Sequence, residues 1–315
     1  MLDPWNYSDQ YQYMRKVARS DMQPLIITVA VTGLSGKEDN QNVPETPREQ
    51  ADDAHRCYQA GATSVHIHAR DDTGAKSIAD AARFRDINRM IRELCPDMII
   101  GNTTGIGPDE PRERAVNVLE AEPELCSLNM GPVCFVFDFK ERKPPLQGRD
   151  KATHAEFVQP FGFTDQERIA RRALEKNIKP EMEIYNNSMF FGIRNLIQNN
   201  LLKKPYWIQA VFSPFFIPPT IEGMANAISL LPTDSLLSVI GVGPFQLNVA
   251  VAAIIAGCHV RVGLEDNLFY RKGEMATNAR LVERIVRIAQ ELGRDIATPT
   301  QAREMLGISS IPTTY

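Results

Sequence analysis

The run Leu25-Ile26-Ile27-Thr28-Val29-Ala30-Val31 is apolar and β-branched almost throughout, which is typical of a strand buried on both faces of a sheet. Seven further apolar runs follow, and most of the segments between them show the helical spacing of apolar residues. We expect strands at residues 25–31, 64–68, 98–101, 125–128, 181–184, 207–211, 236–240 and 259–263. Alternating strands and helices predict an α/β fold with a parallel sheet, and eight strands is the number that closes a (β/α)8 TIM barrel.

Two threonine–glutamate pairs predict where helices begin. Thr46 precedes Pro47 and lies three residues before Glu49, a spacing typical of a capping box with proline in the first turn. Thr164 and Glu167 repeat this spacing ahead of another helical segment.

An open, doubly wound sheet is the alternative fold. Such a sheet usually has a glycine-rich turn after its first strand, and residues 32–36 (Thr-Gly-Leu-Ser-Gly) resemble that turn only loosely. No G-x-G-x-x-G pattern or phosphate-binding P-loop pattern follows, so we favour the barrel.

Two segments stand outside the plan of a simple barrel. Residues 1–22 precede the first strand and are rich in aromatic residues, so we expect an arm or short helix against the barrel or a neighbouring subunit. Residues 23–315 then form a single barrel domain. Within it, residues 133–163 make an unusually long connection between a strand and a helix. Long loops are often functional, and this one should overhang the barrel mouth.

The composition excludes several classes of protein. The chain has 315 residues, 43% of them hydrophobic, and a net charge of −4, which gives no electrostatic footprint for nucleic acid. No apolar run reaches the roughly 18–20 residues of a membrane span, so we do not expect a membrane protein. The five cysteines include no C-x-x-C pair, and the N-terminus has no apolar signal core. We therefore expect reduced thiols and a cytoplasmic location.

The second predicted strand ends with two histidines. His66 and His68 are two residues apart, so their side chains share one face of the strand and can point into one cavity. Two imidazoles in this arrangement can bind one metal ion. The alternative is a pair of histidines that are simply hydrogen-bonded at a strand end.

Charged residues directly follow the last predicted strand. Burying them is costly unless they are paired or serve a site, and Arg261, Glu265 and Asp266 all lie within this stretch. Only the first strand separates the second and eighth strands of a closed barrel. A carboxylate from Glu265 or Asp266 could therefore complete a two-histidine, one-carboxylate set for Zn²⁺, with Fe²⁺ or Mn²⁺ as alternatives. The competing interpretation is an acidic surface turn neutralised by Arg261.

Three more strand ends carry polar residues. They are Thr103, Thr104 and Gly105 after the third strand, Ser127 and Asn129 at the fourth, and Glu181 and Glu183 on the fifth. Each set alone is more simply explained as structural. Their coincidence at successive strand ends favours a site at the mouth of the barrel.

Taken together, these segments resemble the β-keto acid cleavage enzymes, a family that includes 3-keto-5-aminohexanoate cleavage enzyme. The matching segments are 26–33 (Ile-Ile-Thr-Val-Ala-Val-Thr-Gly), 65–70 (Val-His-Ile-His-Ala-Arg), 103–105 (Thr-Thr-Gly), 127–129 (Ser-Leu-Asn) and 261–267 (Arg-Val-Gly-Leu-Glu-Asp-Asn). The resemblance covers residues 24–306, and the order of its two histidine- and arginine-containing motifs is specific.

The resemblance implies a zinc-dependent barrel, working as a homotetramer, that converts a β-keto acid and acetyl-CoA into acetoacetate and a new acyl-CoA. It assigns the zinc ligands to His66, His68 and Glu265. The zinc ion would chelate the keto and carboxylate oxygens of the substrate and acidify the carbon between them.

Further roles follow from the same motifs. Asp266, oriented by Arg261, matches the proposed base, and Thr103 stands where the family usually has a catalytic serine. Substrate-binding positions match Thr104, Gly105, Ser127, Asn129 and Glu183.

The sequence also departs from the family pattern. Where the aminohexanoate enzyme has a glutamate that meets the substrate's amino group, this chain has Leu34 and Ser35, and the nearest acid is Glu38. Other departures are Asn186-Asn187-Ser188, Ile106 and Pro244. We therefore predict a β-keto acid with an uncharged and larger side chain. The alternatives are a CoA-independent metal-dependent lyase, aldolase or hydrolase, and a barrel that only senses such a ligand.

Overall fold

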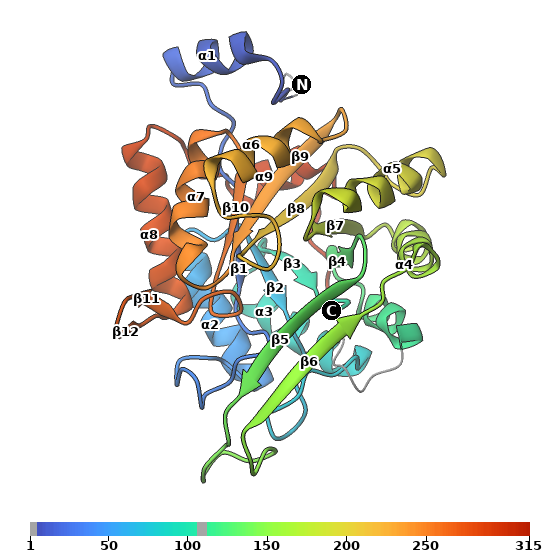
Figure 1. The fold of residues 1–315 in the computed structure, drawn as a ribbon, viewed down its shortest axis with the longest axis vertical. Helices are drawn as coiled ribbons and strands as arrows, with labels where there is room; N and C mark the ends of the chain where they lie inside the picture. The colour runs from blue at the N-terminus through green and yellow to red at the C-terminus, as the bar shows by residue number, and fades with distance from the viewer. Residues whose placement is uncertain (1–4, 106–111) are drawn as a thin grey trace.

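Eight parallel strands close into a barrel in the computed structural model, which describes residues 5–105 and 112–315 (Figure 1). Around the barrel the strands follow the order β1-β10-β9-β8-β7-β4-β3-β2 and return to β1. Their bounds are β1 Ile27–Ala30, β2 Ser64–Ile67, β3 Ile99–Asn102, β4 Leu125–Asn129, β7 Lys179–Ile184, β8 Tyr206–Phe212, β9 Ser235–Gly241 and β10 His259–Val262. The predicted (β/α)8 barrel is confirmed, and each predicted strand boundary lies within two residues of the observed one.

Helices surround the barrel and bury their apolar faces against the strands. The main helices are α2 Pro47–Gln59, α3 Ala81–Leu94, α4 Phe163–Glu175, α5 Phe190–Gln198, α6 Ile221–Ser229, α7 Gln246–Ile255, α8 Asn278–Glu291 and α9 Pro299–Leu306. A 3₁₀ helix, η1 (Arg112–Ala121), lies in the connection between β3 and β4. The smaller elements are η2 Asn187–Met189, η3 Gly243–Phe245, β11 Phe269–Arg271 and β12 Glu274–Met275.

One of the two predicted helix starts is confirmed and the other is wrong. At α2 the Thr46 hydroxyl accepts a hydrogen bond from the Glu49 amide at 3.2 Å, and the Glu49 carboxylate accepts one from the Thr46 amide at 3.1 Å. Helix α4 begins at residue 163 rather than after Thr164. The residue at its start is Gly162, whose amide donates to the Asp165 carboxylate at 3.3 Å, so the acidic partner lies two residues earlier than predicted.

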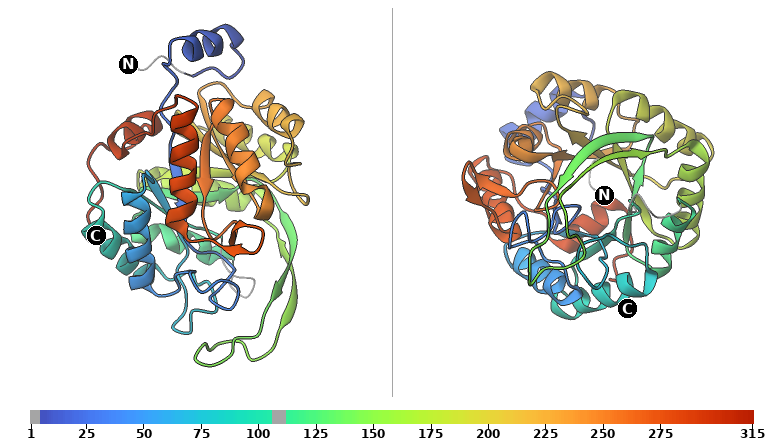
Figure 2. Two further views of the ribbon diagram at one scale, coloured as in Figure 1. Left: turned by 90° about the vertical axis from the view of Figure 1, so that its left-hand side faces the viewer. Right: turned by 60° about the horizontal axis from the view of Figure 1, so that its bottom comes forward.

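The long connection after β4 is a β-hairpin rather than an irregular loop. Strands β5 (Val133–Phe139) and β6 (Thr153–Gln159) pair in antiparallel register along their whole length. Exposed and less exposed residues alternate along β5, because one face packs on the protein and the other meets solvent. Figure 2 shows the hairpin crossing the end of the barrel, so the predicted position over the mouth is the observed one.

The N-terminal arm contacts the opposite end of the barrel, where the strands begin (Figures 1 and 2). It contains helix α1 (Gln10–Ala18), and residues 1–4 lie outside the described part. The Tyr7 hydroxyl accepts from the Leu237 amide at 3.0 Å, and the Tyr13 hydroxyl donates to the Ile255 carbonyl at 2.9 Å. Within the described residues, no helix is long and apolar enough to cross a membrane.

Candidate active site

Two histidines and one glutamate converge at the mouth of the barrel. His66 lies on β2 and His68 just after it, and Glu265 follows β10, with only β1 between these two strands. The His68 Nε2 atom lies 3.3 Å from one oxygen of Glu265, and the His66 Nε2 atom lies 3.8 Å from the other. One potential ligand atom from each of the three residues lies within 4.8 Å of the other two.

The donors of this triad fit a metal ion. The Nδ1 atoms of His66 and His68 and one oxygen of Glu265 are buried without a hydrogen-bond partner. Buried polar atoms are usually satisfied, so the unpaired Glu265 oxygen that lies 3.8 Å from the His66 Nε2 atom fits the role of a metal ligand. Two imidazoles and one carboxylate are a ligand set of catalytic zinc sites that keep an open position.

A glutamate on β7 supports the triad from behind. The Glu181 carboxylate accepts hydrogen bonds from the indole of Trp207 at 3.0 Å and the amide of Gln209 at 2.6 Å. Its other oxygen lies 3.8 Å from the Nδ1 atom of His66. A carboxylate on this side of the ring favours the tautomer that leaves Nε2 free for a metal. The sequence signal was the alternation of Glu181, Glu183 and Tyr185, which places all three on one face of the strand.

Arg261 binds three carboxylates at once. Its guanidinium donates to both oxygens of Asp266 at 3.0 Å, to Glu265 at 2.5 Å and to Glu183 at 3.4 Å. The Tyr185 hydroxyl donates to the remaining oxygen of Glu183 at 3.0 Å. All of these groups are buried or nearly so. One cation facing three carboxylates leaves an excess of negative charge, which a divalent ion beside Glu265 would offset.

The two adjacent acids of the site differ in their proton affinity. Burial raises the pKa of Asp266 to about 6, although Arg261 opposes the shift. Burial also disfavours ionisation of Glu265, but Arg261 and the two imidazoles outweigh it and hold its pKa well below the usual range. At neutral pH Glu265 is therefore anionic, as a carboxylate ligand of a metal must be, and Asp266 is an ionised group with the basicity of a general base.

A cavity of about 300 Å³ opens directly above these residues. Thr103, Gly105 and Asn129 line it together with the triad, Arg261 and Asp266. The Thr103 hydroxyl accepts a hydrogen bond from the Gly105 amide at 2.9 Å. The outer walls are largely apolar and include Leu34, Phe135, Phe137, Phe157, Phe215 and Phe216. The hairpin phenylalanines were not among the residues predicted for the site, although their alternation along residues 133–139 was visible in the sequence.

Two of the residues predicted to bind substrate, Thr104 and Ser127, are buried and do not line the cavity. The Thr104 amide donates to the Ser127 hydroxyl at 2.9 Å, and the Thr104 hydroxyl donates to the Ser127 carbonyl at 2.8 Å. These bonds join the ends of β3 and β4 and so hold Thr103 at the cavity. The departure at Ile106 lies outside the described residues.

Glu38, the acid nearest in sequence to the position of the family's glutamate, is bound by two arginines. The Glu38 carboxylate accepts from Arg142 at 2.6 Å and also from Arg149, and its side chain is 4% exposed. Leu34 lines the cavity, and Ser35 is buried. Glu38 is therefore not among the residues that face the cavity.

Comparisons with known proteins agree on one family. Residues 24–308 match the model of the beta-keto acid cleavage enzymes. The chain is 34% identical to the 3-keto-5-aminohexanoate cleavage enzyme of Fusobacterium nucleatum, over 91% of this chain and 99% of that protein. It is 32% identical to the 3-oxoadipate:acetyl-CoA acetyltransferase of Cupriavidus necator, over 92% and 96% of the two chains. The 3-dehydrocarnitine:acetyl-CoA trimethylamine transferase of Rhizobium meliloti is 28% identical, over 90% and 97%.

Among solved structures, ObcA in complex with oxaloacetate has a similar fold. The TM-score is 0.68 at 18% identity, and the match covers 85% of this chain and 68% of ObcA. At this level of identity the likeness supports the barrel alone.

Proposed function

The chain belongs to the beta-keto acid cleavage enzyme family, and from this membership we propose that it is a zinc-dependent enzyme that exchanges a β-keto acid with acetyl-CoA. The products are acetoacetate and a new acyl-CoA. The observation that carries the proposal is the convergence of His66, His68 and Glu265 beside the Arg261–Asp266 pair, at the floor of one cavity. A metal-binding triad next to a buried base is what proton abstraction beside a carbonyl needs.

The residues of the site account for the steps of this exchange. A zinc ion held by the triad would supply Lewis acidity to the keto and carboxylate oxygens of the substrate. Asp266 accepts the proton of the carbon between these two groups, while the two hydrogen bonds from Arg261 fix its carboxylate. We assign to Thr103 a catalytic hydroxyl at the cavity wall, and to Gly105, Asn129 and Glu183 contacts with the substrate.

Bond formation and cleavage then balance without a further reactant. The deprotonated carbon forms a bond to the acetyl carbonyl carbon of acetyl-CoA, and the CoA sulfur passes from that carbon to the keto carbon of the substrate. The bond between the former keto carbon and the deprotonated carbon breaks. This gives the new acyl-CoA and the carbanion of acetoacetate, which takes back the proton held by Asp266.

We propose that the substrate carries a neutral, apolar group on its keto carbon. Among the described residues that line the cavity, the only charged side chains other than the two histidines are Glu183, Arg261, Glu265 and Asp266, all engaged with one another. Leu34 and the phenylalanines offer no opposite charge to an ammonium group or a second carboxylate, and burying a charge there without an ion-pair partner would be costly. Glu38, the nearest other acid, is bound by two arginines.

The test compares three substrates that differ in charge: 3-oxohexanoate, 5-amino-3-oxohexanoate and 3-oxoadipate. Each is given with acetyl-CoA to the zinc-loaded protein, and acetoacetate and acyl-CoA are measured by mass spectrometry. We expect the highest kcat/KM for 3-oxohexanoate and no product without acetyl-CoA. Turnover without acetyl-CoA would instead favour a lyase, aldolase or hydrolase. Preference for a charged substrate would contradict the neutral group and leave the exchange reaction intact.

A single substitution tests the same idea from the protein's side. Ser35→Glu places an acid near the position that the aminohexanoate enzyme uses, beside Leu34 in the cavity wall. We expect a lower kcat/KM for 3-oxohexanoate and a smaller loss for the amino substrate. Improved use of the neutral substrate would contradict the proposal.

We also propose that the protein works as a homotetramer in the cytoplasm, as the family resemblance implies. Light scattering on the purified protein tests the assembly. A solution mass equal to that of one 35.3 kDa chain would contradict it.

A further inference from the structure

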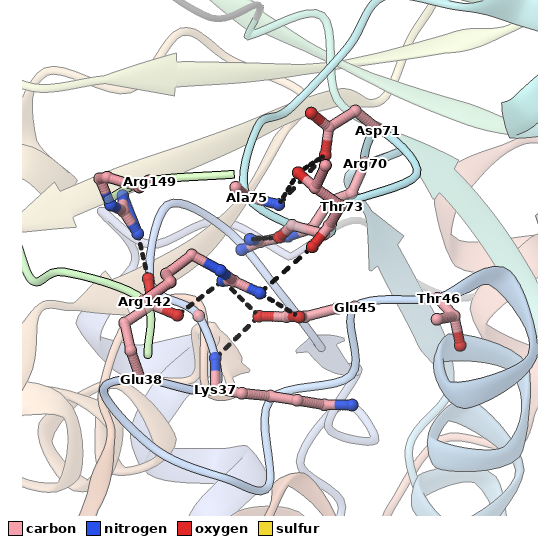
Figure 3. Close-up of polar contacts among 12 residues, drawn as sticks. Lys37, Glu38, Glu45, Thr46, Arg70, Asp71, Thr73, Ala75, Arg142 and Arg149 are labelled. Atoms are coloured by element: carbon pink, nitrogen blue, oxygen red, sulfur yellow. Dashed lines mark hydrogen bonds and ion pairs between the residues drawn. The ribbon is translucent and has the colours of Figure 1, made fainter. Parts of the chain in front are cut away.

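A buried cluster of ion pairs joins the far end of the hairpin to the body of the barrel (Figure 3). Arg142 lies in the loop between β5 and β6, and its guanidinium is completely buried. It donates to the Glu38 carboxylate at 2.6 Å and to the two oxygens of Glu45 at 2.9 and 2.7 Å. It also donates to the Thr73 carbonyl at 3.3 Å, and Arg149 binds the other oxygen of Glu38. The hairpin loop is therefore held to the β1–α2 and β2–α3 connections.

The same connections reach the metal-binding triad. Arg70 donates to the carbonyls of Gly33 and Ser35, both at 2.5 Å, and so holds the start of the β1–α2 connection. Gly33 packs directly on Glu265, since a Cβ atom on Gly33 would lie 2.4 Å from the Glu265 Cγ atom. The segment that the cluster holds thus begins in contact with a candidate zinc ligand.

Aromatic contacts continue from the cluster into the cavity wall. The Arg149 guanidinium lies 4.6 Å from the centre of the Phe139 ring, and that ring lies 4.7 Å from Phe137 and 6.0 Å from Phe157. Phe157 in turn stacks on Phe135 at 4.9 Å. Three of these rings, Phe135, Phe137 and Phe157, line the cavity. A displacement of the hairpin loop would therefore move the wall.

The physical need for such a cluster follows from the hairpin itself. A two-stranded hairpin is marginally stable without further packing, and the outer faces of β5 and β6 are exposed. Buried ion pairs add little net stability, but they tolerate few alternative geometries because each charge must keep its partner. Arg142 with Glu38 and Glu45 thus selects one position of the hairpin.

We propose that Arg142 is a positioning residue, which holds the β5–β6 hairpin over the barrel mouth and so sets the apolar wall that receives the substrate's side group. Arg142 itself is not among the residues that line the cavity. The effect of Arg142 on substrate binding rests on the proposed function, whereas its role in holding the hairpin rests on the contacts alone.

The experiment compares Arg142→Met with Lys140→Met. Lys140 lies in the same hairpin loop, but its side chain is 63% exposed and pairs with Asp39 at 3.0 Å, so its loss should leave the hairpin in place. Amide hydrogen exchange of the whole protein, measured without substrate, reports how often the hairpin opens away from the barrel. We expect at least tenfold faster exchange in residues 133–159 and 36–45 of Arg142→Met, and no change in Lys140→Met.

Kinetics of the zinc-loaded variants give the second readout. We expect Arg142→Met to raise KM at least tenfold for 3-oxooctanoate and less for 3-oxopentanoate, because a longer chain contacts more of the wall. The kcat value and the bound zinc should stay within twofold of those of the unaltered protein, because Arg70 still holds the Gly33 carbonyl and so keeps Gly33 against Glu265. A purely structural role would not produce a KM effect that grows with chain length.

A milder variant keeps the proposal testable if Arg142→Met is unstable. Glu45→Gln retains an oxygen acceptor and should give the same changes to a smaller extent. Unchanged exchange in the hairpin, or faster exchange spread evenly over the barrel, would overturn the proposal in either variant. If no β-keto acid is turned over by the unaltered protein, the proposed function fails, whereas the exchange data still decide the role of Arg142.

Discussion

Gly33→Ala should weaken zinc binding through a single steric contact. A Cβ atom at this position would lie 2.4 Å from the Cγ atom of Glu265 and 3.2 Å from its Cβ and Cδ atoms. Ordinary carbon–carbon contacts begin near 3.5 Å, so the glutamate must move by about 1 Å. Arg70 holds the Gly33 carbonyl at 2.5 Å, which directs the displacement to Glu265 rather than to the backbone of residue 33.

A shift of this size is large for a metal ligand. Ligand distances in zinc sites are held within about 0.2 Å, and disturbing the groups that orient a ligand typically lowers metal affinity about 10- to 100-fold. We therefore expect zinc affinity to fall by that factor, which corresponds to about 1.4–2.7 kcal/mol.

The assay is competition for zinc between the apoprotein and a chromophoric chelator at fixed pH. Gly162→Ala is the matched control, because a Cβ atom on Gly162 would have no neighbour within 4 Å. Zinc affinity of Gly33→Ala within twofold of the unaltered protein, with an equal Tm, would refute the reasoning. It would mean that Glu265 either does not bind zinc or can bind it from another position.

Four further predictions concern the base, the pH profile of activity, the backbone at Gly263 and the pH dependence of stability. Asp266→Asn should lower kcat by about 10²–10⁴ with zinc retained, and should stop deuterium exchange at the acidic carbon of the substrate, followed by NMR. In the unaltered protein kcat/KM should fall below about pH 6, because burial raises the pKa of Asp266 to about 6 and a protonated carboxyl cannot act as the base. A kcat/KM that stays constant down to pH 4 would contradict this role. Gly263→Ala should cost at least about 2 kcal/mol in urea unfolding, since φ is +146° and a Cβ would lie 2.1 Å from the Ala30 carbonyl oxygen. Burial lowers the pKa of Lys179 to about 8, against about 10.4 when unfolded, so the unfolded chain binds more protons between these values. The unfolding free energy relative to Lys179→Met should therefore rise from pH 8 to pH 10, and a fall would show that the ammonium is not desolvated.

The sequence alone determined the barrel and most of the floor of the candidate site. Strands of a parallel barrel are buried on both faces, so they appear as apolar runs that need no knowledge of distant residues. His66 and His68 could be assigned to one face because the period of a strand is two, a purely local rule. Arg261 and Asp266 were found because charged residues directly after a buried strand are costly without a purpose.

The walls and the roof of the cavity were decided by tertiary structure. Residues 133–163 were expected to cross the mouth, but the pairing of β5 with β6 places the phenylalanines, and pairing register depends on contacts across the hairpin. Thr104 and Ser127 match family positions in sequence, yet they bind each other and do not line the cavity. Side-chain direction at a strand end depends on the neighbouring strand, which the local pattern does not specify.

The ion pairs of Arg142 could not be predicted from the sequence either. Glu45 and Arg142 are 97 residues apart, and nothing in the composition of either segment marks the other as its partner. Glu38 was the acid nearest in sequence to the position of the family's glutamate, and only the folded chain supplies the arginines that bind it. The sequence determined which chemical groups reach the mouth of the barrel, because strand period and burial are local properties. The tertiary structure decided which of those groups face the substrate, because that depends on charges and rings brought together from distant parts of the chain.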